Sequence, residues 1–171
     1  MRAALECQAA GACNALTPAV LPRSGRCDSI ATMKKTIYLT TEADTQALGR
    51  ELAQSASRGD VIALAGDLGT GKTTLAQAIA EGLGVREAVT SPTFTILAEY
   101  DSGRIPFYHF DVYRVHDPDE LFEIGFAEYL EGDGLCVVEW ADLVEDLLPP
   151  GALRVRLEMG AGESERICVI G

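Results

Sequence analysis

The stretch Gly66-Asp67-Leu68-Gly69-Thr70-Gly71-Lys72-Thr73 separates two glycines by four residues and follows them with lysine and threonine, which is the pattern of a phosphate-binding loop. The apolar run Val61-Ile62-Ala63-Leu64-Ala65 precedes the stretch, and an amphipathic helix pattern follows it. This order of strand, loop and helix is the context that the motif requires. The stretch therefore predicts a site for a nucleotide triphosphate.

The residue types of this loop suit phosphate chemistry. Glycine accepts a positive φ, so successive backbone N–H groups can turn inward and hold phosphate oxygens. The helix N-terminus adds a partial positive charge, Lys72 adds a full charge at the β and γ phosphates, and the Thr73 hydroxyl is placed to be a ligand of Mg²⁺. The full match in context disfavours the alternative of an ordinary glycine turn. The expected nucleotide-binding residues of the loop and helix are Gly66, Asp67, Leu68, Gly69, Thr70, Gly71, Lys72, Thr73 and Thr74.

Length, charge and cysteine usage narrow the class of protein. The chain has 171 residues, 47% of them hydrophobic, and is most simply a single domain. No run approaches the roughly 20 apolar residues of a membrane span, so we expect a soluble protein with no membrane partner. The five cysteines include no CxxC pair, which indicates neither a zinc site nor a disulfide framework and favours a cytoplasmic location.

The acidity of the chain bears on its partners. Its formal net charge is −12, and residues 33–171 carry 11 basic and 24 acidic side chains, a net charge of −13. Affinity for RNA or DNA comes mainly from Lys and Arg on phosphates, so this balance speaks against unaided binding of nucleic acid. The alternative is that acidity only keeps the protein soluble.

Residues 1–32 differ from the rest of the chain. They are rich in alanine, contain only two acidic side chains and show no sustained periodicity. They are either an organelle transit segment or a mis-assigned extension ahead of a start at Met33, and we favour the second because Lys34, Lys35 and the following strand pattern resemble a protein's beginning. We expect this segment to be disordered in both cases, and residues 33–171 to form the folded domain.

Hydrophobic periodicity predicts strands and helices in alternation. Capping boxes at Thr41 and Asp117 open two helices, in addition to the helix after the phosphate loop, and another is expected after Trp140, stopping at the prolines 149 and 150. The predicted strands are 36–40, 61–65, 94–100, 104–110, 135–138, 152–158 and 166–170. Those at 61–65 and 135–138 are apolar throughout and are expected at the centre of the sheet. The pattern predicts an α/β fold, a P-loop NTPase-like three-layer sandwich with a mixed central sheet.

The run Thr90-Ser91-Pro92-Thr93-Phe94-Thr95 surrounds a proline with hydroxyls. It follows the first helix after the loop, where phosphate-loop proteins often carry a Thr or Ser that senses the γ-phosphate or Mg²⁺. Thr93 is therefore a candidate switch residue. A turn that leads into the next strand is an equal alternative, because Ser and Thr suit turns.

Two predicted strands end in acids. Asp111 follows the strand 104–110, and Glu139 follows 135–138 in the arrangement of a Walker B strand. Such acids can reach Mg²⁺ or the attacking water, so we take both as candidate catalytic residues, and Glu139 with Thr73 as a candidate metal ligand. His109 is more simply a hydrogen-bonded structural residue than a catalyst.

Trp140 is the only tryptophan and directly follows Glu139. Two interpretations are open for it. It either lies near the nucleotide as part of the binding site or fills the core.

Taken together, the motifs of this sequence resemble those of the TsaE family, also called YjeE. The resemblance rests on the phosphate loop, Ser91-Pro92-Thr93-Phe94, the pattern 109–114, the pattern 125–130 and Val138-Glu139-Trp140, in this order, and it covers Met33 to about Leu157. It implies a small bacterial ATPase, with ATP and Mg²⁺ as cofactors, that works with TsaD and TsaB to place threonylcarbamoyl on the adenosine beside the tRNA anticodon. The ATPase does not itself transfer the group, and tRNA is reached only through the complex. By position, Lys72 and Thr73 would hold phosphate and Mg²⁺, Thr93 would lie in the switch, and Asp111 and Glu139 would be the acids of ATP hydrolysis.

Three other classes share features of this sequence. A P-loop small-molecule kinase usually needs an Arg-rich lid, whereas only Arg86, Arg104 and Arg114 lie between the loop and Glu139. A GTPase would carry an Asn-Lys-x-Asp guanine reader, which does not occur here. A structural nucleotide-binding module would bind ATP without turnover even with partners. The N-terminal extension is the one departure from the family pattern.

Overall fold

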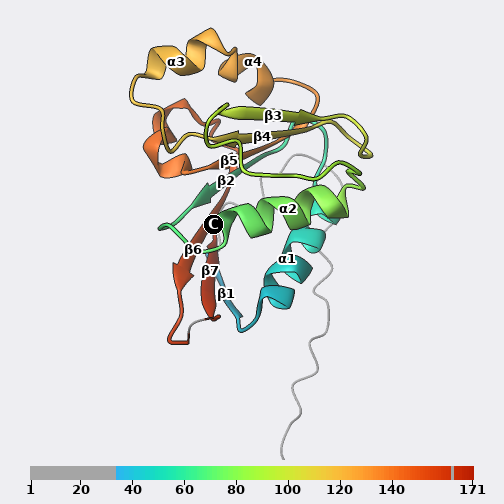
Figure 1. Ribbon diagram of the computed structural model, residues 1–171, viewed down its shortest axis with the longest axis vertical. Helices are drawn as coiled ribbons and strands as arrows, with labels where there is room; N and C mark the ends of the chain where they lie inside the picture. Colours follow the sequence, from blue (N-terminus) through green and yellow to red (C-terminus); the bar gives the residue numbers. More distant parts are fainter. Residues whose placement is uncertain (1–33, 163) are drawn as a thin grey trace, which may run out of the picture.

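The computed structural model describes residues 34–162 and 164–171. The predictions made for residues 1–32 lie outside the described residues. Within these ranges seven strands form one sheet (Figure 1): β1 (Lys35–Leu39), β2 (Val61–Ala65), β3 (Leu97–Tyr100), β4 (Phe107–Asp111), β5 (Leu135–Glu139), β6 (Leu153–Met159) and β7 (Arg166–Ile170). The helices are α1 (Glu42–Ser55), α2 (Lys72–Gly82), α3 (Pro118–Glu123) and α4 (Phe126–Leu130), with 3₁₀ turns η1 (Ala141–Leu143) and η2 (Glu145–Leu147). In the part of the chain described, no helix is both long and apolar enough to cross a membrane.

The sheet is mixed, as predicted. Its strand order is β1-β7-β6-β2-β5-β4-β3. The four strands β6, β2, β5 and β4 pair in parallel, and β3, β7 and β1 add antiparallel edges. The predicted central position of β2 and β5 is confirmed. Both are flanked by parallel neighbours and buried on both faces, which explains their uninterrupted apolar sequences.

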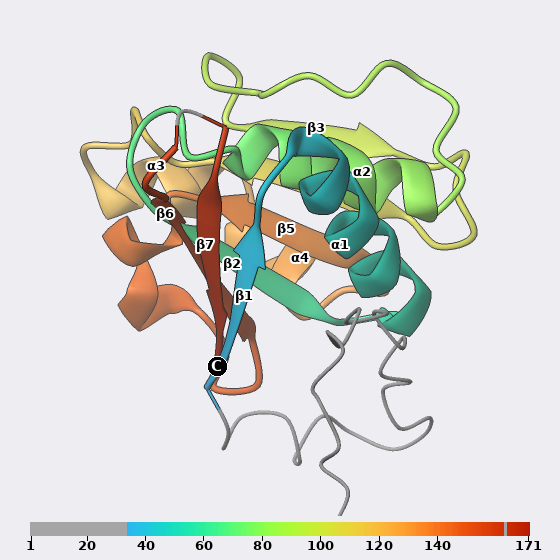
Figure 2. The same ribbon diagram turned by 90° about the horizontal axis from the view of Figure 1, so that it is seen from below.

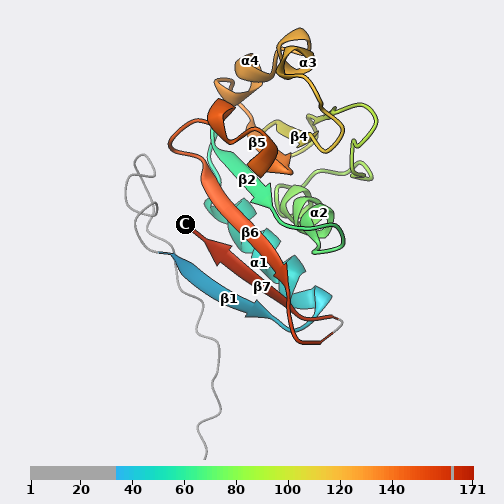
Figure 3. The same ribbon diagram turned by 90° about the vertical axis from the view of Figure 1, so that its left-hand side faces the viewer.

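Alternate residues of the sheet serve two separate cores. On one face Ile62 and Leu64 pack with α1 and α2, and on the other Val61 and Ala63 pack with residues of α3, α4 and the 3₁₀ turns. The fold is therefore a three-layer α/β sandwich. The second layer of helices is incomplete, because Figure 3 shows α1 behind β6 and β7 with none of the described helices in front of these strands.

The helix starts follow the predicted capping boxes. The Asp44 backbone N–H donates to the Thr41 Oγ1 at 3.2 Å, and the Thr41 N–H donates to the Asp44 carboxylate at 2.9 Å. Asp117 and Glu120 form the same arrangement at the start of α3. Gly125, at φ 71°, lies between α3 and α4 and is the residue from which α4 begins, a conformation that glycine accepts without strain.

Three element predictions need correction. The helix expected after Trp140 is replaced by η1 and η2, because Val144 leaves helical geometry between them and Leu148 is extended ahead of a proline. The strand expected from residue 94 begins at Leu97, since a turn closed by the Ile96 N–H on the Pro92 carbonyl at 2.7 Å precedes it. The strand expected over 104–110 is β4, Phe107–Asp111, and so includes Asp111 itself.

Helices α1 and α2 lie side by side, as Figure 2 shows. They pack against one another through small residues. Gly49 of α1 faces Ala78 of α2, and a Cβ added at Gly49 would clash with the Ala78 Cβ. Gly82 faces Ala53 in the same manner. This close contact holds α2, and with it the loop ahead of Lys72, against α1.

Gly49→Ala is expected to destabilise the protein. In an open helix position this change would stabilise by roughly 0.5–1 kcal/mol, but here the helices must separate, so the free energy of unfolding should fall by about 1–3 kcal/mol. Urea unfolding followed by circular dichroism measures the difference. Gln54→Ala, at an exposed position of the same helix, is the control and should stay within about 0.5 kcal/mol. Equal or greater stability of Gly49→Ala would contradict the packing.

Candidate functional site

The loop between β2 and α2 has the backbone that its glycines predict. Gly66, Gly69 and Gly71 have φ of 136°, 81° and 96°, which are conformations that other residues rarely adopt. Two features exclude a side chain at Gly66: its positive φ, and a clash that a Cβ would make with the Leu157 carbonyl of β6. Helix α2 begins directly after Gly71, so its N-terminal amides open onto the loop.

Lys72 is folded back over this loop. Its ammonium donates to the carbonyls of Gly66 and Asp67 at 2.7 and 2.8 Å and lies 3.7 Å from the centroid of the Trp140 ring. Only 5% of the residue is exposed. Burial lowers the pKa of the lysine, and the nearby carboxylates of Glu139 and Asp111 partly oppose that effect.

The two predicted acids meet at the edge of the sheet. In the parallel pairing of β4 with β5, Asp111 lies opposite Glu139, and in the pairing of β2 with β5, Glu139 lies opposite Leu64. Both acids are buried. The Thr73 hydroxyl donates to the Glu139 Oε2 at 2.9 Å, so the predicted metal ligands are in direct contact.

Asp111 anchors the segment that carries the candidate switch residue. The hydroxyls of Ser91 and Thr93 donate to its Oδ2 at 2.6 and 2.8 Å. The segment forms a turn ahead of β3, as one of the two interpretations of this run proposed. Ile96 closes the turn and has a φ of 65°. Thr93 is thus within reach of the site through a bond to a catalytic candidate, and its role as a switch stays a prediction.

The remaining predicted residues lie around this centre. Thr70 is buried and donates from its hydroxyl to the Asp67 carbonyl at 2.8 Å, which closes the loop. Thr74 lies in the first turn of α2. Asp67 and Leu68 form the exposed tip of the loop, and Leu68 is 79% exposed. Trp140 is half-buried: its ring lies next to the Lys72 ammonium and also packs against the second core, so both interpretations remain open.

Some contacts of the site were not predicted. Tyr113 packs on Trp140 with ring centroids 4.6 Å apart, and Arg166 of β7 donates to the Gly69 carbonyl at 3.1 Å. Ser91 belongs to the hydroxyl-rich run 90–95, and its place in that run is the sequence signal that could have identified it as a partner of Asp111. No local signal marks Arg166, because 97 residues separate it from Gly69.

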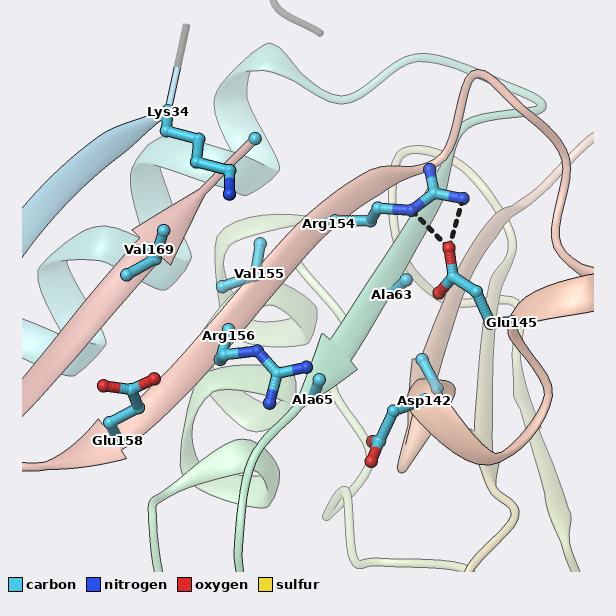
Figure 4. A pocket seen from close by; sticks show the side chains of 12 residues that line it. Lys34, Ala63, Ala65, Asp142, Glu145, Arg154, Val155, Arg156, Glu158 and Val169 are labelled. Carbon is cyan, nitrogen blue, oxygen red and sulfur yellow. Dashed lines mark hydrogen bonds and ion pairs between the residues drawn. The ribbon is translucent and has the colours of Figure 1, made fainter.

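A second hollow lies on the open face of the sheet. This pocket of about 630 Å³ is bordered by β6 and η1, and no residue of the loop Gly66–Thr73 lines it. Arg154 is paired with Glu145 across one wall, with a shortest distance of 2.7 Å (Figure 4). Charges of both signs line the pocket, including Lys34, Arg156, Asp142 and Glu158. Lys72, Asp111 and Glu139 are not among its lining residues.

The parallel strands, the glycine loop between β2 and α2, and acids at the ends of β4 and β5 define an α/β protein of the P-loop NTPase-like class. The family described as "Threonylcarbamoyl adenosine biosynthesis protein TsaE" matches residues 39–168. The chain therefore belongs to the TsaE family, as the sequence resemblance indicated.

Individual relatives agree. The chain is 48% identical over 123 residues to the tRNA threonylcarbamoyladenosine biosynthesis protein TsaE of Bacillus subtilis (strain 168), which covers 72% of this chain and 76% of the relative. It is 40% identical over 126 residues to the protein of the same name from Treponema pallidum (strain Nichols), covering 74% and 93%. The crystal structure of Bacillus subtilis YdiB superposes with a TM-score of 0.68 at 39% identity, over 81% of this chain and 84% of that one.

Lys72→Met is expected to change the fluorescence of the only tryptophan. The substitution keeps an unbranched side chain, one atom shorter than that of lysine, and removes the positive charge 3.7 Å from the centroid of the Trp140 ring, so the emission of the indole should shift in wavelength or intensity. Lys35→Met in β1 is the matched control and should leave the spectrum unchanged. Identical spectra for wild type and Lys72→Met, with both proteins folded by circular dichroism, would show that the contact is absent in solution.

Proposed function

We propose that this protein is the ATPase component of the machinery that adds threonylcarbamoyl to the adenosine next to the anticodon of tRNA, acting with TsaB and TsaD. Membership of the TsaE family supports the pathway. The observation that carries the proposal of hydrolysis is the convergence of Lys72, Asp111 and Glu139 on the glycine loop. One cation and two acids beside a nest of backbone amides are the groups that phosphoryl transfer to water requires.

The residues fit ATP with Mg²⁺. Backbone N–H groups in a loop of positive-φ glycines, with the N-terminus of α2 behind them, suit phosphate oxygens. The hydroxyl of Thr73 and the carboxylate of Glu139, 2.9 Å apart, are oxygen donors of the kind that Mg²⁺ prefers. When bound, the magnesium nucleotide would supply the phosphoryl group and the charge that neutralises it. Lys72 would bind phosphate in place of the carbonyls that it now contacts.

The segment around Thr93 supports control by the nucleotide state. Thr93 and Ser91 both donate to Asp111, so the segment is attached to one of the two acids. A Thr93 hydroxyl that turned to the metal or the γ-phosphate would give up this bond, and the surface beside the site would change with it. Phe94, next to this hydroxyl, is 85% exposed and is the kind of side chain that a partner protein covers.

The kinase alternative lacks support from the arginines. The Arg104 guanidinium binds the carbonyls of Ala53 and Ala56 at the end of α1, and Arg114 lies over the Phe94 ring at 4.5 Å. Within residues 34–162 and 164–171, neither forms a hydrogen bond or ion pair with the loop that would mark it as part of a lid over a transferred phosphoryl group. Hydrolysis with water as acceptor is the simpler use of this site.

Glu139→Gln should damage hydrolysis more than binding. It keeps the size of the side chain but removes the carboxylate charge that faces Thr73, so we expect turnover to fall by about 10²–10⁴-fold while the dissociation constant for ATP changes by less than about threefold. Phosphate release measures the first and Trp140 fluorescence the second. Lys72→Ala is the comparison and should weaken binding itself, because it removes the cation of the loop. Equal loss of binding and turnover in Glu139→Gln would argue for a purely structural acid.

Partner dependence gives a second test. We expect weak ATP turnover by the isolated protein, stimulation by purified TsaB and TsaD, and negligible affinity for free tRNA at physiological salt, because the folded part is strongly acidic. Phe94→Ser should reduce the stimulation, whereas Phe122→Ser, which changes the 65% exposed ring on α3, should not. Tight tRNA binding by the protein alone, lost steeply on adding salt, would count against the proposal. ATP binding without turnover in any combination would indicate a structural nucleotide-binding module.

A further inference from the structure

His109 is a wholly buried histidine whose ring faces the candidate site. It lies on β4, two residues before Asp111, and its relative exposure is 0%. Its Nε2 is 2.8 Å from the Oε1 of Glu139 on the neighbouring strand β5. The sequence alone favoured a structural role for this residue, but among the described residues the one hydrogen-bond partner of its ring is a candidate catalytic acid.

Glu139 is consequently held at both of its oxygens. The Thr73 hydroxyl donates to Oε2 at 2.9 Å, and the imidazole reaches Oε1 at 2.8 Å. A carboxylate that is only 2% exposed needs such donors, because a buried charge without partners is strongly unfavourable. The Thr73 hydroxyl belongs to the proposed metal site, where its oxygen would also serve the metal, whereas the imidazole contacts the other oxygen of Glu139 from β4.

The contacts of the ring assign its hydrogen. Nδ1 has no hydrogen-bond partner among the described residues, while Nε2 contacts a carboxylate. A neutral imidazole carries one hydrogen, and placing it on Nε2 satisfies the carboxylate and leaves on Nδ1 only an unused acceptor. Phe107 lies beside the ring, with centroids 6.0 Å apart. The ring is thus packed in one orientation and donates toward Glu139.

The two acids differ in what holds them. Asp111 accepts from Ser91 and Thr93, which belong to the turn that precedes β3. Glu139 is held instead from β4, within the sheet. A rearrangement of the turn would therefore remove both donors from the Oδ2 of Asp111, which would keep only the Tyr113 N–H on Oδ1 at 3.1 Å, and would leave the imidazole contact of Glu139 unchanged.

We propose that His109 is a positioning residue: its Nε2–H holds the Glu139 carboxylate facing Thr73, independently of the segment around Thr93. This rests on the proposed function, in which Glu139 serves the metal or the water of ATP hydrolysis. Residues that orient a ligand or catalytic carboxylate in this way typically contribute about 10–100-fold to affinity or activity.

The test compares two amides at one position in the full chain. In His109→Gln the longer side chain can bring its amide N–H to the place of Nε2, whereas in His109→Asn the amide ends one methylene short and cannot reach Glu139. Turnover with TsaB and TsaD, the dissociation constant for ATP and thermal stability are measured for both variants. The same measurements are made for each variant in a Glu139→Gln background. His116→Asn, which changes the exposed histidine, is the control.

We expect His109→Asn to lower the turnover number about 10–100-fold, with ATP affinity within about threefold of wild type, and His109→Gln to recover most of the loss. In the Glu139→Gln background the two His109 variants should differ from one another by less than about twofold, because a residue that acts through Glu139 has nothing left to position. Wild-type turnover in both variants, or equal losses in both that add fully to that of Glu139→Gln, would overturn the proposal in favour of a packing role.

Crystal structures of the two variants decide the geometry without any turnover. The contact of Glu139 with Thr73 should persist in His109→Gln and be lost in His109→Asn. Glu139 in its original place in both would overturn the proposal. If the wild-type protein hydrolyses no ATP under any condition, the proposed function fails, and the comparison of structures still tells whether His109 positions Glu139.

Discussion

The candidate site depends on the parallel pairing of β5 with both β2 and β4. Strands that run in the same direction end at the same edge of a sheet, so the register that sets Glu139 opposite Leu64 also sets Asp111 opposite Glu139. The loop leaves β2 at this edge and returns as α2 with Lys72 and Thr73 in its first turn. A change of register by one residue would turn each acid to the other face of the sheet.

This arrangement gives each buried charged side chain of the site its polar partners. Lys72, Asp111 and Glu139 are each no more than 5% exposed, and none could be buried cheaply alone. The ammonium has two carbonyls and an indole ring, and the carboxylates have hydroxyl and imidazole donors. Polar groups from the glycine loop, α2, β4 and β5 therefore bind one another, and these contacts order the site.

The sequence predicted most of the elements, and its errors are physically instructive. The helix expected after Trp140 fails because prolines and an extended residue limit the segment to single 3₁₀ turns. Strand β3 starts later than predicted because a turn precedes it in which Ile96 takes a positive φ. A β-branched residue seldom has this conformation, so the sequence did not predict the turn's geometry. Both errors concern short segments whose geometry is decided by packing against β4, β5 and the second core.

The glycine loop, its lysine and threonine, the two capping boxes and the apolar runs of β2 and β5 could be identified from sequence, because each is a local pattern whose backbone or solvation demands allow few alternatives. The acids Asp111 and Glu139 could also be identified from sequence, because each stands at the end of an apolar strand pattern. The hydrogen-bond partners of these groups could not be identified in this way. The pairing of His109 with Glu139, of Ser91 with Asp111 and of Arg166 with the loop joins residues far apart in the chain. Such contacts exist only after strand order and register bring the segments together, since hydrogen bonds depend on distances of a few ångströms that no local pattern encodes.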